Sequence, residues 1–288
     1  SEAGSPARSA FRVDEPCAPV AAVGASEKSR VVCVPGGAFV LGAERSRLGN
    51  AMPERLAVVP RFWMDRYEVS VARFRARAAE LGRTRSSDLQ ANEGPLLPPK
   101  ELFDTPTLCT WSASPRGRED YPLNCVAWSI ARRFCQLEGG DLPREVQWEY
   151  AASAAARPHK TRFPWGDNQV SCERAAVNRG YLDDGQTPIS KSTCGDARHF
   201  GPAPVTEHDR PDGDVTPGLG IVGLGGNVAE WALDEAERFD EPCWIATTMT
   251  SRWCAPRADT LRHSVRGGEF LLAMEAAAAD TRRGSPDT

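Results

Sequence analysis

The sequence lacks features that mark several functional classes. Its longest apolar run near the end, 270–274, falls far short of the roughly 18 residues that a membrane-spanning helix needs. Its 35 Lys and Arg residues against 39 Asp and Glu residues give a formal net charge of −4. We therefore expect no transmembrane segment and no nucleic-acid partner, because phosphate binding needs a Lys/Arg excess on one face. No basic and apolar leader opens the chain, so we expect a signal peptide to be absent or already removed.

Close metal-binding spacings are also absent. No CxxC pair occurs, and the four histidines lie far from any tight cysteine spacing: His159, His199, His208 and His263. A structural zinc site usually shows such spacings, so it has little support here.

Cysteine, by contrast, is plentiful, and its count of nine is odd. Spacings of 16, 22 and 11 residues between some neighbours are typical of disulfides that close local loops. Disulfides persist in oxidising compartments, so the count predicts a periplasmic, cell-surface or secreted protein. The alternative is a cytosolic protein with nine reduced, buried thiols.

Composition divides the 288 residues into an arm and one folded body. Residues 1–29 are rich in Ser, Ala, Pro and Glu and poor in large apolar side chains, which predicts a tether or a surface-laid arm. Residues 30–288 form the body, and their length suits one large domain or two small ones.

The body is predicted to be loop-rich α+β, with little regular secondary structure. Strands at 31–34 and 38–41 flank a Pro-Gly-Gly turn. Apolar residues at helical spacing predict three helices, over 71–81, 127–137 and 143–155. We predict a long surface loop over 82–122, almost no regular structure over 156–264, and a strand with its continuation over 265–274.

Several phrases follow one another in the body: 34–42 (VPGGAFVLG), 62–70 (FWMDRYEVS), 121–128 (YPLNCVAW), 142–152 (LPREVQWEYAA), 163–167 (FPWGD), 226–231 (GNVAEW) and 265–270 (VRGGEF). The series resembles the formylglycine-generating enzyme family, also called the sulfatase-modifying factor family, over roughly residues 31–284. This resemblance implies a variation on the C-type lectin-like fold. It also implies a capping Thr where this chain has Arg144, so we expect a weaker helix cap, with Asp141 as a partial substitute.

The family's enzymes oxidise a substrate cysteine with two cysteines that bind copper, four and nine residues beyond the second Gly of Arg-Gly-Gly. Here those positions are Leu272 and Ala277. Neither side chain can form a thiolate or bind Cu(I), so we expect no cysteine oxidation and no copper. A second branch of the family holds iron with three His on an added helical domain, which the scattered histidines do not match.

Paired carboxylates are weaker catalytic candidates. Glu230 and Asp234 lie four residues apart, as do Glu145 and Glu149, so each pair could share one face of a helix. Such carboxylates usually make solvated or loop-stapling contacts, which favours a structural role.

The resemblance also implies that calcium sites lie in the loop-rich half, where Asn, Asp and carbonyl oxygens would be the ligands. The candidate ligands of the first site are Asn178, Asp196 (with Asp183 or Asp184 as rivals) and the carbonyls of Arg179 and Arg198. In the second, the family's anchoring side chain falls on Gly223, so only the carbonyls of Gly226 and Val228 remain. Ordinary loop hydrogen bonds are the alternative for the first set.

Eight cysteines bracket loops in pairs: Cys17 with Cys33, Cys109 with Cys125, Cys172 with Cys194, and Cys243 with Cys254. Cys135 is left over. In the family its counterpart pairs with a cysteine in a C-terminal strand, and this sequence stops at Thr288 before such a strand. Either the chain is truncated or processed, or the last strand is lost, and Cys135 would then be a buried thiol.

These observations predict a non-catalytic, disulfide-stapled binding or structural subunit of an exported assembly, with a protein or a glycan as partner. We expect recognition at the arm or at the loops 82–122 and 232–262, since variable loops on a rigid scaffold usually carry it. The alternative is a divergent enzyme that uses the family groove with new residues. Under the first hypothesis a groove lined by Leu272, Met274 and Ala277 is apolar and inert.

Overall fold

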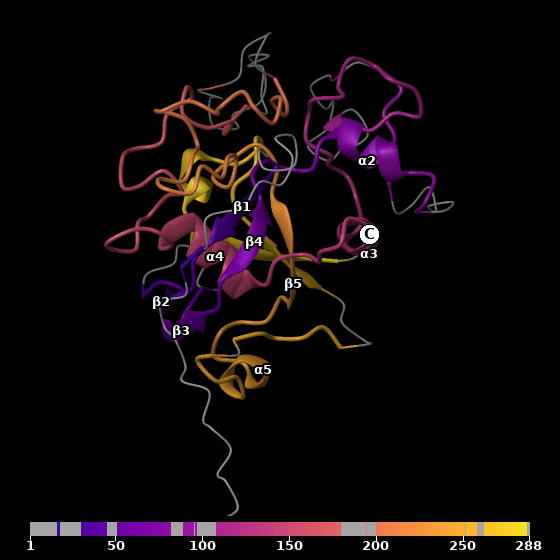
Figure 1. Ribbon diagram of the computed structural model, residues 1–288. Helices are drawn as coiled ribbons and strands as arrows, with labels where there is room; N and C mark the ends of the chain where they lie inside the picture. The colour runs from indigo at the N-terminus through magenta and orange to yellow at the C-terminus, as the bar shows by residue number, and fades with distance from the viewer. Residues whose placement is uncertain are drawn as a thin grey trace, which may run out of the picture.

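Short strands and helices joined by long ordered connections make up the computed structural model (Figure 1). It describes residues 16–17, 30–44, 51–81, 89–94, 96, 108–179, 194, 200–250, 252–257 and 262–286. Across these residues the loop-rich α+β prediction is confirmed. None of the helices described is long and apolar enough to cross a membrane.

Three small antiparallel sheets carry the strands of the described residues. β1 (Val31–Val34) pairs with β4 (Phe62–Asp65), β2 (Gly37–Leu41) pairs with β3 (Arg55–Val59), and β5 (Glu230–Glu235), β6 (His263–Arg266) and β7 (Arg282–Ser285) form a sheet in that order. The two strands predicted around the Pro-Gly-Gly turn are confirmed, but they pair with other strands rather than with each other. The strand predicted over 265–274 is wrong in its extent, because Gly267 adopts a φ of +79° and ends it.

The three predicted helices are confirmed in place and are shorter than predicted: α2 (Val71–Arg77), α3 (Trp128–Leu137) and α4 (Glu145–Ser153). A further single turn, α5 (Pro242–Ile245), lies within the predicted loop 232–262. Ser70 caps α2 by accepting a hydrogen bond from the Arg73 amide at 3.2 Å. Figure 1 shows α4 at the centre of the molecule, with α2 and α3 to one side of it.

The cap of α4 differs from the prediction. Arg144 makes no side-chain cap, as expected, but the Asp141 carboxylate accepts from the Leu142 amide instead of capping the helix. Asp234 on β5 supplies the cap, because its Oδ2 accepts from the Glu145 amide at 2.7 Å. A strand 89 positions along the chain therefore adds to the local cap of Gln147, whose Oε1 accepts from the Arg144 amide at 2.9 Å.

Two buried glutamates make α4 the centre of the core. Trp148 and Tyr150 of α4 pack among apolar side chains of β1, β2 and β3. Glu149 accepts from the Gly42 amide at 2.7 Å and pairs with Lys160 at 2.8 Å and with the fully buried Arg266 at 2.6 Å. Burial opposes ionisation of Glu149, but Lys160 and Arg266 outweigh it and lower its pKa.

The other buried glutamate, Glu145, binds the last strand. Its carboxylate accepts two hydrogen bonds from the Arg282 guanidinium, at 2.9 and 2.8 Å, and another from Ser264. α4 is thereby tied to β6 and β7.

Four disulfides close local loops, and all four predicted pairings are confirmed: Cys17–Cys33, Cys109–Cys125, Cys172–Cys194 and Cys243–Cys254. Cys135 is a free thiol, as predicted, and is half-buried. Burial raises its pKa to about 12, so it stays protonated at neutral pH.

The prediction of a surface loop over 82–122 is partly wrong. Its described part, 89–94, 96 and 108–122, holds no helix or named strand, but Leu108, Cys109 and Thr110 are buried. Arg118 explains this, because its guanidinium lies inside the loop and donates to the carbonyls of Cys109 and Asn92.

Replacing Glu149 tests the dependence of the fold on this buried charge. We expect Glu149→Gln to lower the free energy of unfolding by about 3–5 kcal/mol, because Arg266 would stay buried without its counter-charge. Urea unfolding followed by circular dichroism measures this. Glu93→Gln is the matched control, since Glu93 pairs with Arg116 at the surface and its loss should change stability far less.

Candidate functional site

The segment that follows β6 is the place where the resemblance puts the family's thiols. Gly267 and Gly268 carry the chain past another segment so closely that a Cβ on Gly268 would lie 2.3 Å from the Gly225 carbonyl oxygen. Beyond this turn the Phe270 amide donates to the Asn227 carbonyl at 2.9 Å, and the Leu272 carbonyl accepts from the Asn178 amide at 2.8 Å. Three distant parts of the sequence therefore meet at 268–272.

The two thiol positions do not face an open groove together. Ala277 is fully buried in a cluster with Phe163, Trp165 and Val177, and Met274 packs against that cluster. Leu272 is half-buried. The expected groove lined by Leu272, Met274 and Ala277 is therefore wrong, because Ala277 belongs to the core.

Three carboxylates gather behind this segment: Glu68, Asp214 and Glu230. Glu68 accepts from the Asn227 side-chain amide at 2.7 Å and from the Val228 amide at 3.1 Å. Asp214 accepts from the Gly225 amide at 2.7 Å through Oδ2, while its buried Oδ1 has no hydrogen-bond partner within the described chain. Neither buried oxygen of Glu230 accepts a hydrogen bond of full geometry, although the Trp148 indole N–H and the Glu230 backbone lie near enough to oppose the rise in its pKa. Such oxygens are unusual in a native interior.

The pKa values of these carboxyl groups all lie above their ordinary range. Burial raises the pKa of Asp214 to about 7, although the Gly225 and Gly226 amides oppose this. Burial also raises the pKa of Glu68 and of Glu230 well above the ordinary value. For Glu230 the neighbouring charges of Glu68 and Asp214 add to the effect of burial. The cluster is therefore either protonated or neutralised by a cation.

The donor set suits a hard cation. Carboxylate and carbonyl oxygens are the ligands that calcium takes, and no soft ligand is part of the cluster. Glu68 fills the space beside Gly223, since a Cβ there would lie 3.2 Å from the Glu68 carboxyl carbon. A carboxylate from another segment thus stands where the second calcium site was expected to lack its anchor.

The geometry limits how such an ion is held. Among the described residues, the ligand atoms of these three carboxylates are not all within 4.8 Å of one another. One ion would therefore be bound by part of the cluster together with carbonyls such as those of Gly226 and Val228.

The first predicted calcium site is described only in part. Asn178 has a φ of +49°, and the Arg179 amide donates to the Phe270 carbonyl at 2.6 Å. The Arg179 guanidinium pairs with Glu207 at 3.4 Å. Asp183, Asp184, Asp196 and Arg198 lie outside the described residues. The site therefore stays a prediction.

A pocket of about 1340 Å³ opens beside the carboxylates. Glu68 and Glu230 line it, together with the aromatic side chains of Trp148, Trp231 and Phe270. Its lining also includes charged side chains such as Arg73, Glu138 and Arg144, so it is a broad groove of mixed polarity.

Three of the four carboxylates in the predicted pairs have structural roles: Glu145, Glu149 and Asp234. Glu145 and Glu149 share one helix, as expected, and are saturated by the partners described above. The helix expected for Glu230 and Asp234 is wrong, because both lie on strand β5. Asp234 accepts from the amides of Glu145 and Cys254 at 2.7 and 2.9 Å. Its oxygens are committed to the backbone.

Sequence reasoning missed Glu68 and Asp214. Glu68 lies among apolar residues in the phrase FWMDRYEVS and did not stand out as a candidate ligand. Asp214 lies in a Gly- and Pro-rich stretch with many Asp residues, so nothing distinguished it from them. The one available signal was a Glu between apolar neighbours ahead of a helix, which is too weak to select it.

Comparisons with known proteins agree with this architecture. The sulfatase-modifying factor enzyme 1-like domain matches residues 19–287. The chain is 26% identical over 270 residues to the formylglycine-generating enzyme of Thermomonospora curvata, covering 84% of this chain and 82% of that protein. It is also 29% identical over 126 residues to the inactive C-alpha-formylglycine-generating enzyme 2 of Bos taurus, covering 44% and 37%.

Structural similarity extends further than sequence similarity. PvdO from Pseudomonas aeruginosa matches 90% of this chain and 88% of its own, with a TM-score of 0.55 at 16% identity, which shows a shared fold. The match to the formylglycine-generating enzyme of Bos taurus spans only 59% of that protein.

Asp234 should make stability depend on pH. Burial, and then the charge of Glu145, raise its pKa from 3.8 to about 8. Between about pH 4 and about pH 8 the folded chain thus holds a proton that the unfolded chain has lost, so the stability contributed by Asp234 falls as pH rises. We expect the difference in unfolding free energy between wild type and Asp234→Asn to shrink over this window.

Urea unfolding at several pH values measures this difference. Asp234→Asn should also be less stable throughout, by about 1–3 kcal/mol. The substitution turns one of the two acceptor oxygens into an NH2 group, which cannot accept the hydrogen bond of the backbone N–H that faces it. Asp240→Asn changes an exposed carboxylate in the next connection and should leave the pH profile as in wild type. If the difference in unfolding free energy between wild type and Asp234→Asn stays constant with pH, the raised pKa of Asp234 is contradicted.

Proposed function

The chain belongs to the sulfatase-modifying factor enzyme 1-like family, and we propose that it is a non-catalytic binding or structural member of it. The observation that carries the proposal is Ala277, whose methyl group is fully buried between aromatic side chains at one thiol position. Leu272 holds the other position. Neither residue can supply the sulfur chemistry of the family's oxidases.

We also propose a compartment and a binding surface for the protein. Four disulfides, and relatives that are formylglycine-generating enzymes, support an exported protein in an oxidising compartment. The small sheets and long connections support a C-type lectin-like variant, whose loops would contact a protein or a glycan. The pocket beside Glu230 offers the ligand surface.

Calcium is the proposed cofactor. Its place is the cluster of Glu68, Asp214 and Glu230, where it would neutralise buried charge and satisfy oxygens that lack partners. In this role the ion stabilises the pocket wall and takes no part in a reaction.

A divergent enzyme is the second candidate, and one observation favours it. Glu68 and Glu230 line the pocket with pKa values well above the ordinary value, as general acids often do. The unpartnered oxygens favour the cation instead, since a general acid needs no further ligand.

The oxidase test addresses the main proposal directly. We expect the full chain, incubated with Cu(I), oxygen and a cysteine-bearing peptide, to form no formylglycine above a protein-free control. Mass spectrometry of the peptide measures this, with the Thermomonospora curvata enzyme assayed in parallel. Turnover above background would overturn the proposal.

Calcium should raise the thermal stability of the chain. A cation that binds only the folded state stabilises it by about 2.7 kcal/mol at 100 times Kd, so we expect Tm to rise with calcium and to fall again with a chelator. Glu230→Gln should abolish most of the rise. Without calcium this variant should be at least as stable as wild type, because it removes a buried carboxylate that lacks partners.

Differential scanning calorimetry at fixed protein concentration measures both effects. Glu80→Gln is the control, since Glu80 is half-exposed on a surface turn and should keep the full calcium response. An equal calcium response in Glu230→Gln and wild type would show that the ion binds elsewhere.

A further inference from the structure

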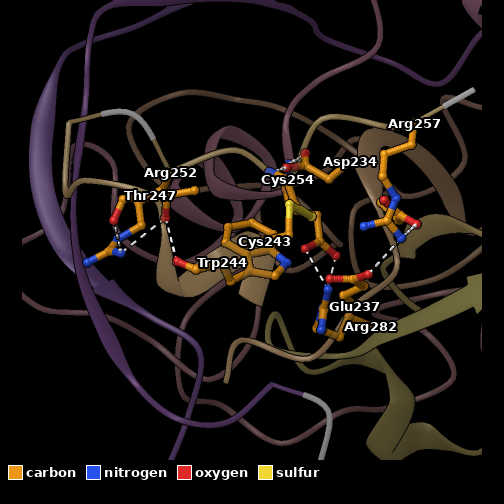
Figure 2. The surroundings of a disulfide bond; sticks show 11 residues. Asp234, Glu237, Cys243, Trp244, Thr247, Arg252, Cys254, Arg257 and Arg282 are labelled. Carbon is orange, nitrogen blue, oxygen red and sulfur yellow. Dashed lines mark hydrogen bonds and ion pairs between the residues drawn. A yellow bond between two sulfur atoms is a disulfide. The ribbon is translucent and has the colours of Figure 1, made fainter. Parts of the chain in front are cut away.

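A second ligand cluster surrounds the Cys243–Cys254 disulfide, beside strand β5. The two sulfurs and one carboxylate oxygen of Glu237 lie within 4.8 Å of one another. In the part of the chain that the structure describes, no other three Cys, His, Asp or Glu ligand atoms come this close. Figure 2 shows Asp234, Glu237 and Trp244 gathered around the disulfide, with Arg257 beyond Glu237.

The cluster is fixed on one side and open on the other. Cys254 is fully buried and is bound to β5 twice, because its amide donates to Asp234 at 2.9 Å and its carbonyl accepts from the Glu235 amide at 2.9 Å. Cys243 is half-buried, and the Glu237 side chain is 23% exposed. A small ion can therefore reach the sulfurs past Glu237.

The Glu237 carboxylate is held in a way that permits exchange. Its ion pair with Arg257 is 3.1 Å long, and the Arg257 side chain is 58% exposed. Arg257 also pairs with Glu235 at 2.8 Å, so it keeps a partner if Glu237 turns to a metal. Surface ion pairs of this kind contribute little to stability.

We infer that Cys243, Cys254 and Glu237 form a latent site for a thiophilic divalent cation of the zinc class, which opens when the disulfide is reduced. A dithiol supplies the two electrons: its two S–H groups become its own disulfide, and the Cys243–Cys254 bond becomes two thiols. Zinc then displaces one proton from each thiol. Two thiolates and one carboxylate bring three negative charges to an ion of charge +2, which leaves the site with a net charge of −1.

The ligand chemistry selects the metal. Two thiolates favour zinc over calcium or magnesium, which take oxygen ligands. Three protein ligands leave a fourth position for water, as in open zinc sites. Asp234 acts behind Cys254 as a positioning residue, because it fixes the backbone that carries one sulfur.

Cysteine spacing in the sequence does not reveal this site, because the folded connection that contains α5 brings the two cysteines together. The cysteines are 11 residues apart, and the single turn Pro242–Ile245 lies at the first of them. The folded connection brings their Cα atoms to 5.5 Å, a proximity that a CxxC search does not detect.

Cobalt(II) is the probe that tests this inference. The full chain is reduced with a dithiol under anaerobic conditions, freed of the dithiol and titrated with Co²⁺, whose bonds to thiolates give a near-ultraviolet charge-transfer band. We expect one equivalent of Co²⁺, displaced by zinc, in the reduced chain and no band in the oxidised chain. The double variant Cys243→Ser with Cys254→Ser should lose the band, and Glu237→Gln should keep it with affinity lower by at least about tenfold.

The control is Cys109→Ser with Cys125→Ser, which removes another disulfide of similar loop length and should keep the band. Zinc should also protect Cys243 and Cys254 of the reduced wild type from alkylation, as mapped by mass spectrometry, and this readout needs no variant. A band that survives in the Cys243→Ser, Cys254→Ser chain would overturn the inference. So would unchanged affinity in Glu237→Gln, or a reduced chain that binds no Co²⁺ or stays unfolded in its presence.

Discussion

Glu149 and Arg266 meet at 2.6 Å with neither side chain exposed, so Glu149 compensates the buried charge of Arg266, and Lys160 at 2.8 Å helps to compensate Glu149. Glu149 also fixes the end of β2 through the Gly42 amide. Arg266 ends β6 directly before the turn at Gly267, and that turn sets the path of the chain past Asn227. The placement of the candidate site thus follows from a pair of charges on α4 and β6, which no local preference of either segment encodes.

Local patterns were enough to predict part of this architecture. α3 presents Trp128, Ile130 and Phe134 at helical spacing, and its position was predicted correctly. β5 was not predicted, since half of its six residues are acidic and would normally face water. Asp234 is buried there because the backbone amides that satisfy it come from α4 and from the connection after α5. Burial of this kind depends on tertiary partners, and a strand pattern cannot show it.

The carboxylate cluster shows the same limit in the site. Glu68 and Asn227 are 159 positions apart, and each looks like an ordinary polar residue in its own segment. Only the fold reveals that Glu68 fills the space beside Gly223. Burial raises the pKa of all three acids, and the charges of Glu68 and Asp214 raise that of Glu230 further. The arrangement therefore makes physical sense either with bound protons or with a cation. A cation would serve both oxygens of Glu230, and a proton together with the Trp148 indole N–H would serve them without an ion.

The segment that would carry oxidase chemistry in the family is part of the packed core here, because Ala277, Ala278 and Ala279 are buried. The charges of α4 hold the core, and the four disulfides close the connections. Ala277 adds a well-packed methyl group to the cluster of Phe163 and Trp165, where a reactive thiol would need access to solvent and substrate. Replacing chemistry with packing at this position therefore favours the fold. A scaffold stabilised in this way leaves its surface loops available for binding.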